Sequence, residues 1–510
     1  MILVHPPVVR PCEPPAGIAR LAGAFRHHGI PVHVWDANIE CLLFLMETTH
    51  NAYDTWTKGA LRRLDRNLKE LRSPHGYINI DRYTRAVRDL GRVLQYASGS
   101  HEVRVGLADY HDTRLSALKS SDLLHAAEHP EISPFYSFFS MRLSSLLEEN
   151  LPGFIGFSIN YLSQALTAFA MIGYLKKTFP GLRIILGGGL VSSWMSRPGW
   201  KNPWQGMVDI MIAGPGEAQL LELHGTDQGP LFYTPDYSGL SFDNYFAPGN
   251  ILPYSASGGC YWSRCSFCPE KTENSFFRPA ATSQVISDLS KLKEQTHPCL
   301  VHFLDNALSP ALLKHLCEHP LGIPWYGFAR ITPELADEDF CRNLRKSGCV
   351  MLKLGIESGD QKVLDTLEKG IDLKIASCAL KTLKRVGISS YVYLLFGTPA
   401  ESEIDARKTL KFTIENAAEI DFLNLAIFNL PRFSPDAGNL KTGEFYEGDL
   451  SLYCSFVHPS GWNRTSVRDF LDKEFKKHPA IRPILRQDPA VFTSNHAPFF
   501  ATAVLHKSIS

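Results

Sequence analysis

The chain has 510 residues, 44% of them hydrophobic and 20% charged, which is enough apolar sequence for the cores of two or three globular domains. Its 52 Lys and Arg residues balance its 52 Asp and Glu residues, and the sequence shows no basic stripe, so a nucleic-acid partner is not indicated. The balanced charge favours a small molecule or a peptide as the substrate.

Neither a signal peptide nor a membrane span is predicted. The apolar start, Met1–Val4, is cut off by His5-Pro6-Pro7, which is too early for a signal sequence. The longest apolar tract, around 161–175, is interrupted by polar residues and falls short of a membrane-spanning helix. We therefore expect a cytoplasmic protein with no membrane partner.

Residues 1–225 alternate between short apolar segments and helical patterns. This alternation is typical of a doubly wound (Rossmann-like) parallel sheet. A mostly helical stretch at about 41–150 would be an insertion after the second strand. The expected strands are Met1–His5, Pro31–Trp35, Phe154–Ser158, Arg183–Leu186 and Asp209–Ala213.

Residues 226–250, rich in Gly, Pro, Asp and Tyr, are expected to be a linker, and a second alternating series occupies 251–430. Six strand–helix units predict a partial, TIM-like (β/α)6 barrel, with its chemistry at the carboxyl ends of the strands. Residues 431–510 are expected to form a covering segment with little regular structure. The expected barrel strands are Leu252–Ser257, Leu300–Leu304, Trp325–Arg330, Val350–Ile356, Ser390–Phe396 and Phe422–Phe428.

Three cysteines crowd together just after the first expected barrel strand. Cys260, Cys265 and Cys268 have the spacing C-x4-C-x2-C, and Gly258-Gly259 allow the backbone to loop around one point. Three thiolates leave one iron of a 4Fe-4S cluster open to a small molecule, whereas a structural zinc site is closed by four ligands. Residues 269–288 contain no Cys or His to complete a zinc site. The spacing favours an iron–sulfur cluster; an incomplete zinc knuckle or chance clustering is the alternative.

This cysteine loop on a six-unit barrel resembles the radical S-adenosylmethionine (SAM) family, as does the aromatic Phe267 before the last cysteine. The commoner family spacing is C-x3-C-x2-C, and the extra residue, with the string Cys-Tyr-Trp, is similar to that of some cobalamin-binding members. The resemblance implies that SAM chelates the open iron. It also implies that an electron from a donor such as flavodoxin or ferredoxin cleaves SAM to a 5′-deoxyadenosyl radical.

Candidate SAM contacts lie at the barrel strand ends. A carboxylate at Glu357 could accept hydrogen bonds from both ribose hydroxyls, and the guanidinium of Arg330 matches the SAM carboxylate. Asp305 could receive the SAM amino group, and the turn at Gly397 resembles the family's adenine loop. The alternative for each is an ordinary exposed charge or turn. The full predicted SAM set is Phe267, Asp305, Asn306, Arg330, Glu357, Ser358, Gly397 and Pro399.

Residues 1–40 and 151–225 resemble the cobalamin-binding domain that precedes many radical SAM barrels. Glycines at strand ends would let a flat corrin approach the backbone closely. The D-x-H-x-x-G string of His-ligated cobalamin proteins is missing, so we expect water or no ligand below the cobalt. A plain turn or a phosphate nest is the alternative. The predicted cobalamin set is Pro7, Ser158, Gly187, Gly188, Gly189 and Glu217.

Three functions remain open from the sequence. The first is a cobalamin-dependent radical SAM methyltransferase acting on an unactivated carbon, or on phosphorus, of a small molecule or peptide. The second is a rearrangement, cyclisation or oxidation with the same radical and no methyl transfer. The third is a non-catalytic metal- or cobalamin-binding protein. The cysteine set together with Glu357 and the Gly397 turn disfavours the third.

Overall fold

The computed structural model describes residues 1–49, 52–99, 102–149, 152–226, 229–273, 275–490 and 497–499. The chain forms two compact units. The first unit comprises Met1–Ile251 with Tyr446–Leu452, and the second comprises Leu252–Phe445 with Tyr453–Pro489. No helix among the described residues is long and apolar enough to cross a membrane.

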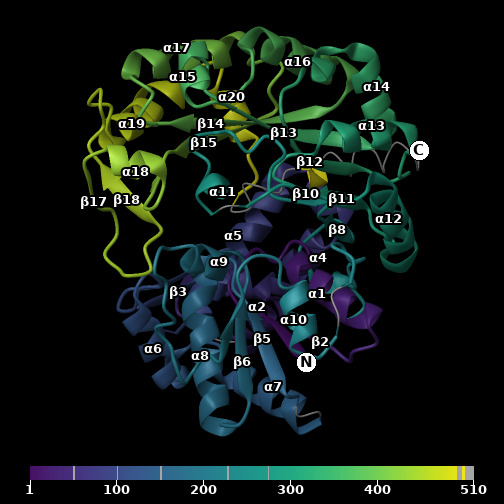
Figure 1. Ribbon diagram of the computed structural model, residues 1–510, viewed down its shortest axis with the longest axis vertical. Coiled ribbons are helices and arrows are strands. Elements are labelled where there is room, and N and C mark those ends of the chain that lie inside the picture. Colours follow the sequence, from purple (N-terminus) through teal and green to yellow (C-terminus); the bar gives the residue numbers. More distant parts are fainter. Residues whose placement is uncertain are drawn as a thin grey trace. The chain divides into compact units, whose positions relative to one another are not determined.

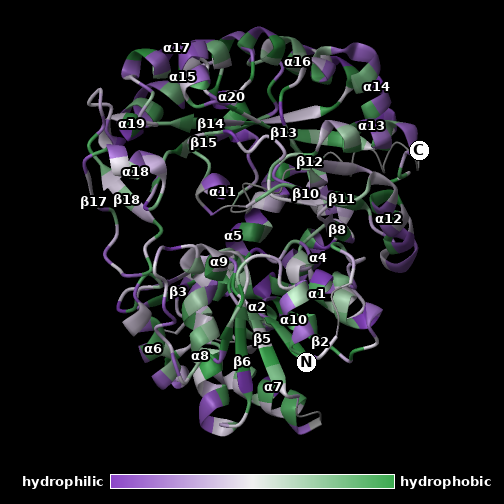
Figure 2. Cartoon of the chain, in the orientation of Figure 1, coloured by the Kyte–Doolittle hydropathy of each residue, from purple (hydrophilic) through white to green (hydrophobic). Residues whose placement is uncertain are grey.

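The first unit contains a five-stranded parallel sheet in the order β2-β1-β5-β6-β7. Strands on both sides of β1 confirm the doubly wound fold, and Figure 2 shows β5 and β6 as hydrophobic. The last strand is shorter than expected because Asp209 instead accepts hydrogen bonds from the Ile184 amide and from Lys176. The strands are β1 (Ile2–His5), β2 (His33–Asp36), β5 (Phe154–Ser158), β6 (Arg183–Gly187) and β7 (Ile210–Met211). The helices beside them are α1 (Ala16–His27), α8 (Leu162–Thr178), α9 (Gly189–Met195) and α10 (Glu217–Glu222).

The segment between β2 and β5 is mostly helical, but it also contains a hairpin of β3 (Val103–Val105) and β4 (Tyr110–Asp112). The hairpin was not expected, because its strands are too short to show an alternating pattern. The helices are α2 (Ala37–Thr48), α3 (Thr55–Arg62), α4 (Leu64–Leu71), α5 (Ile80–Ala97), α6 (Ser120–Glu128) and α7 (Tyr136–Glu149).

The second unit contains a six-stranded sheet in the order β15-β14-β13-β12-β11-β8, which follows the chain in reverse. The adjacent pairs from β11 to β15 are parallel, as expected for a partial barrel. Helices α14, α16 and α17 lie along one side of this sheet (Figure 1). The strands are β8 (Ile251–Tyr254), β11 (Leu300–Phe303), β12 (Trp325–Ala329), β13 (Cys349–Glu357), β14 (Ser389–Phe396) and β15 (Phe422–Ile427). The helices are α12 (Thr282–Thr296), α13 (Pro310–Glu318), α14 (Glu338–Lys346), α15 (Gln361–Thr366), α16 (Leu373–Val386) and α17 (Glu403–Glu415).

The segment after β15 has more regular structure than the sequence indicates. An antiparallel sheet in the order β16-β18-β17 forms from β16 (Leu430–Pro431), β17 (Thr442–Glu444) and β18 (Tyr453–Phe456). Helices α18 (Pro435–Asn439), α19 (Arg464–Phe470) and α20 (Arg482–Arg486) accompany it. Phe428 and Leu430 pack against Cys454, so this segment is anchored next to the end of β15.

Candidate functional site

The three cysteines lie on a loop that leaves the sheet after β8. The loop starts at β9 (Ser257–Gly258), which pairs with β10 (Arg278–Pro279), and it ends at α11 (Pro269–Thr272). Gly259 has φ +70°, and a Cβ there would lie 2.6 Å from the carbonyl oxygen of Phe276. Glycine is therefore required where the chain turns into the cysteine loop.

The thiols of Cys260, Cys265 and Cys268 are partly buried and near one another. Burial, with smaller contributions from the neighbouring Cys265 and Cys260, raises the pKa of Cys268 to about 11. Burial also raises the pKa of Cys265, against the lowering effect of Lys369 and Arg330. A cationic cluster would favour all three thiolates, so the donor set fits a 4Fe-4S cluster that keeps one iron for an exogenous ligand.

The segment 367–370, which follows α15, holds the cysteine loop by its main-chain carbonyls. The Ser266 amide donates to Leu367 O at 3.0 Å, and Trp262 Nε1 donates to Glu368 O at 2.9 Å. The guanidinium of Arg330 donates to Lys369 O and lies 4.3 Å from the centre of the Trp262 ring. Trp262, in the longer first gap of the cysteine motif, is therefore the anchor of the loop.

We expect Gly370→Ala to loosen this anchor. Gly370 has φ +65°, and a Cβ there would overlap the six-membered ring of Trp262. Gly387 is the matched control, because it has φ +78° but its Cβ would meet only Arg345 Nε, at 3.9 Å. Gly370→Ala should cost about 1–3 kcal/mol more than Gly387→Ala, the usual cost of overpacking. Thermal unfolding and retained iron measure the difference, and equal effects of the two variants would contradict the anchoring role.

A buried ion pair lies beside the cysteine loop. Lys369 Nζ is 2.8 Å from Glu357 Oε1, and the two side chains are 8% and 13% exposed. Lys369 Nζ also lies 5.7 Å from the centre of the Phe267 ring. Gly355 leaves room for the pair, since a Cβ there would lie 2.5 Å from Glu357 Oε1. Glu357 itself has φ +70°, a strained conformation of the kind that gathers at functional sites.

Lys369, which the structure places in this buried pair, is not among the residues predicted from the sequence. It stands twelve positions after Glu357 along the chain, and its ammonium donates a hydrogen bond to Glu357 Oε1 at 2.8 Å. The available signal was the string Leu367-Glu368-Lys369-Gly370 in the connection between the fourth and fifth barrel strands. A lysine in such a connection is usually exposed, so nothing in the sequence distinguished this one.

Asp305 and Asn306, after β11, have different environments. Asp305 is buried, and its carboxylate accepts hydrogen bonds from the Ala256 amide at 3.0 Å and from the Ser257 hydroxyl. Burial raises the pKa of Asp305, and these hydrogen bonds oppose the rise. Asn306 is exposed. Asp305 therefore holds the base of the cysteine loop, and a contact with SAM through either residue stays a prediction.

Arg330 and Ser358 are also engaged inside the protein. Arg330 is 8% exposed, and Nη1 is 3.9 Å from Cys265 Sγ. Ser358 is fully buried; its hydroxyl is 3.2 Å from Thr409 Oγ1 and accepts from the Asp360 amide at 3.1 Å. The structure thus brings Arg330, Glu357 and Phe267 together around the cysteines, whereas Ser358 faces α17.

The turn after β14 is built on Gly397, which has φ +77°. Its amide donates to Glu401 Oε2 at 2.5 Å, and the same oxygen accepts from Trp462 Nε1 at 3.0 Å. The carbonyl of Thr398 accepts from His458 Nε2 at 2.8 Å, and Pro399 is partly buried. The segment after β15 therefore fixes this turn.

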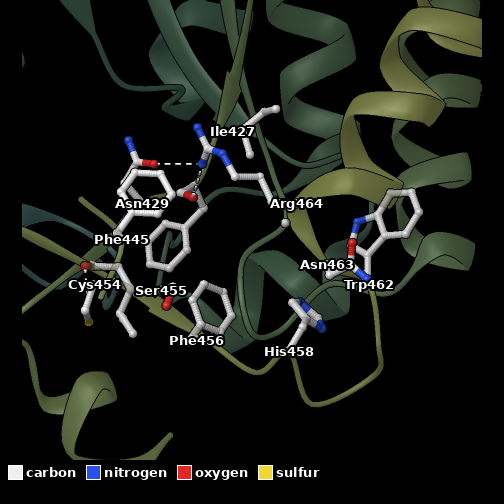
Figure 3. Close-up of a pocket in the computed structure, with 13 residues that line it drawn as sticks. Ile427, Asn429, Phe445, Cys454, Ser455, Phe456, His458, Trp462, Asn463 and Arg464 are labelled. Atoms are coloured by element: carbon white, nitrogen blue, oxygen red, sulfur yellow. Dashed lines mark hydrogen bonds between the residues drawn. The ribbon is translucent and has the colours of Figure 1, made fainter. Parts of the chain in front are cut away.

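A pocket of about 70 Å³ opens beside the Gly397 turn, at the carboxyl ends of β14 and β15. Figure 3 shows aromatic side chains around it and Arg464 bonded to Asn429. Arg464 Nη1 donates to Asn429 Oδ1 at 2.8 Å. The lining residues are Gly397, Ile427, Phe428, Asn429, Leu430, Phe445, Cys454, Ser455, Phe456, His458, Trp462, Asn463 and Arg464.

The Gly397 turn should make stability depend on pH. Burial raises the pKa of Glu401 from 4.5 to about 7. The folded state binds the proton of the Glu401 carboxyl more tightly than the unfolded state does. Protonation therefore stabilises the fold fully below pH 4.5, and this stabilisation is lost as the pH rises through about 7. Glu401→Gln removes the ionisation. When the pH is raised from about 5 to about 8, the free energy of unfolding of the variant should therefore increase relative to that of the wild type by up to about 3 kcal/mol. Thermal unfolding at both pH values measures this gain, and Glu415→Gln on the exposed side of α17 is the control. A difference that is the same at both pH values would contradict the prediction.

In the first unit, the predicted glycines line the carboxyl edge of the sheet. Gly188 has φ +103°, and a Cβ there would lie 2.5 Å from Ile159 O. The Gly189 amide donates to Asn160 Oδ1 at 2.9 Å, and Asn160 Nδ2 donates to Ser158 Oγ at 3.2 Å. Ser158 and Gly187–Gly189 are therefore adjacent, as the sequence predicts for strands β5 and β6.

Gly189 and Gly214 are exposed at this edge and have open space beside them. A Cβ at Gly214 would meet no atom within 4 Å, and one at Gly189 would meet only Asn160 Oδ1, at 3.7 Å. Pro7 is buried instead, with its carbonyl accepting from the Thr167 hydroxyl, and Glu217 pairs with Arg20 at 2.6 Å. The glycine edge fits a corrin approaching the backbone, while Pro7 and Glu217 are engaged in contacts within the unit.

Residues 254–413 match the model of the radical SAM superfamily. The chain is 25% identical over 215 residues to an uncharacterized methyltransferase of Pyrococcus horikoshii, covering 40% of this chain and 45% of that protein. It is 26% identical over 363 residues to the anaerobic magnesium-protoporphyrin IX monomethyl ester cyclase of Rubrivivax gelatinosus, covering 60% of this chain and 63% of the cyclase. The chain therefore spans less than two thirds of the length of either relative.

The solved structures of the radical SAM methyltransferase TsrM from Kitasatospora setae have a similar fold. The structure with tryptophan and a SAM analogue aligns with a TM-score of 0.59 at 13% identity, over 100% of this chain and 99% of that one. The structure with cobalamin and a [4Fe-4S] cluster aligns with a TM-score of 0.51 at 14% identity, over 85% and 73%. At this level of identity the likeness shows the fold.

Proposed function

We propose that this chain, whose residues 254–413 form a radical SAM domain, is an enzyme that binds a 4Fe-4S cluster and SAM in its second unit. The cluster ligands are Cys260, Cys265 and Cys268. The observation that carries the proposal is the buried Lys369–Glu357 pair next to Phe267 and Cys265. SAM joins an amino acid to a nucleoside. A cation matches the carboxylate of its amino-acid part, and a carboxylate at a strand end matches the hydroxyls of its ribose.

In this arrangement Lys369 binds the SAM carboxylate and Glu357 accepts hydrogen bonds from the ribose hydroxyls. Arg330 positions the cysteine loop by stacking on Trp262 and bonding Lys369 O. The turn at Gly397 and Pro399, with the pocket beside it, receives the adenine. When bound, the cluster supplies the electron that cleaves SAM reductively, and the partly buried cysteine loop limits its exposure to water.

The first unit binds cobalamin at the edge formed by Ser158 and Gly187–Gly189. The open surface over Gly189 and Gly214 supports this assignment, as does the shared fold with TsrM, one structure of which contains cobalamin. Bound cobalamin supplies a carrier for a methyl group. The reaction is therefore methyl transfer to an unactivated carbon or phosphorus of a small molecule, with flavodoxin or ferredoxin as electron donor.

One observation favours a second candidate. The relative with the longer matched region, 363 residues, is a cyclase. A cyclisation or oxidation would use the same cysteines and the same Lys369–Glu357 pair but would need no methyl transfer. The two candidates differ in the fate of SAM and not in the residues that bind it.

The products formed from SAM separate these functions. Anaerobically reconstituted protein, supplied with cobalamin and reduced by flavodoxin or dithionite, is incubated with SAM and candidate substrates. A methyltransferase of this kind yields both S-adenosylhomocysteine and 5′-deoxyadenosine, whereas a cyclase yields only the nucleoside. Formation of neither product would contradict the proposed enzyme.

A further inference from the structure

Two helices of this chain end in the same string. Helices α6 and α13 both contain nine residues and end in His-x-x-Glu-His-Pro, at 125–130 and 315–320. The second histidine follows the last helical residue in each case, with φ −125° at His129 and −127° at His319. Its amide donates to the carbonyl of the first histidine at 3.0 Å and 2.9 Å, respectively. The sequence therefore builds the same corner twice.

Each corner gathers metal-ligating atoms. In His125, Glu128 and His129, one ligand atom from each residue lies within 4.8 Å of the other two, and the same holds for His315, Glu318 and His319. The imidazole centres are 4.6 Å apart in the α6 corner and 4.4 Å apart in the α13 corner. Two histidines four positions apart form a common zinc-binding pair on a helix, and here the last turn and the residue after it bring the two imidazoles equally near one another. Zinc–ligand bonds of about 2.1 Å would need only a rotation of these side chains.

The position in the helix also favours a cation. Each corner lies at the carboxyl end of its helix, where the macrodipole is negative. In the α6 corner the three ligand residues are exposed, so binding a metal displaces only solvent. Lys177 reaches the same helix end, but its ammonium donates to the main-chain carbonyl of Glu128 and not to the Glu128 carboxylate.

The α6 corner has a second carboxylate beside His129 that the α13 corner lacks. Glu131 Oε1 is 3.3 Å from His129 Nδ1. The position that corresponds to Glu131 in the α13 corner is Leu321. Two imidazoles and two carboxylates form a donor set suited to zinc and similar cations.

We propose that His125, Glu128, His129 and Glu131 form a binding site for a divalent transition-metal cation of the Zn²⁺ class. The site is separate from the cysteine loop and does not depend on the proposed enzyme activity. The α13 corner, with the same string but Leu321, is a weaker version of it.

Zinc alone, titrated by calorimetry into the anaerobic cluster-reconstituted protein in a non-chelating buffer, tests the site. His125→Ala with His129→Ala should remove the tightest binding event, whereas His315→Ala with His319→Ala should leave it unchanged. Glu131→Leu makes the α6 corner a copy of the α13 corner and should weaken binding at least about tenfold. His125, His129, Glu131 and His319 are exposed and His315 is partly buried, so folding should persist, and unchanged far-UV circular dichroism checks this. Tight binding that survives the double histidine variant, or that is unaffected by Glu131→Leu, would overturn the proposal.

Discussion

Replacing Cys265 with alanine is expected to abolish both iron–sulfur incorporation and SAM cleavage. Cys265 lies between the other two cysteines in the chain, with Arg330 Nη1 3.9 Å from its sulfur, and Lys369 opposes the rise in its pKa that burial causes. Removing one thiolate from a set of three leaves two ligands, too few to hold a cluster that already lacks a fourth. Iron and sulfide content and the visible absorbance of the reconstituted variant measure the loss.

Cys378 provides the matched control for this substitution. It is an exposed cysteine on α16, in the same unit but outside the cysteine loop. Cys378→Ala should retain wild-type iron content and SAM cleavage. If Cys265→Ala retained both as well, the cysteine loop would not be the cluster site.

Replacing Lys369 with methionine is expected to weaken SAM binding by about a hundredfold or more. The substitution removes one charge of a buried pair, and in a binding site truncating one partner of a buried, hydrogen-bonded charge pair typically costs about 2–5 kcal/mol of binding free energy. It also removes the group assigned to the SAM carboxylate. Equilibrium dialysis of SAM against the cluster-loaded variant measures the affinity.

Because Lys369→Met leaves Glu357 buried without its partner, the variant could unfold locally. The double variant Lys369→Met with Glu357→Gln removes both charges and keeps the volume, and Lys369→Arg keeps the cation. SAM binding should be lost in the double variant and largely kept in the arginine variant. If the double variant holds its cluster and binds SAM with wild-type affinity, the pair does not form part of the SAM site.

The sequence predicts the sheets well because the strands have strong local patterns. Helix Leu162–Thr178 and strand Phe154–Ser158 occur where the alternation of apolar residues indicates them, and the cysteine spacing marks the loop after the first strand of the second sheet. Gly259, with φ +70°, explains why a glycine precedes Cys260. These features depend on neighbours in the chain, which a pattern can record.

The partners of individual side chains could not be predicted, because they come from distant segments. Trp262 bonds Glu368, 106 positions away, and Trp462 bonds Glu401, 61 positions away. Asp305 could be placed at a strand end from the sequence, but its bond to Ser257 depends on how the cysteine loop folds back. Lys369 became a candidate only when the structure placed it against Glu357.

Electron paramagnetic resonance of the reduced, reconstituted protein with and without SAM reports directly on whether SAM binds the cluster. We expect about four iron atoms per chain and a cluster spectrum that changes when SAM binds the open iron. The change should disappear in the Lys369→Met, Glu357→Gln double variant. A fully loaded cluster whose spectrum does not change with SAM would mean that the cysteine loop and the Lys369–Glu357 pair do not form one SAM site.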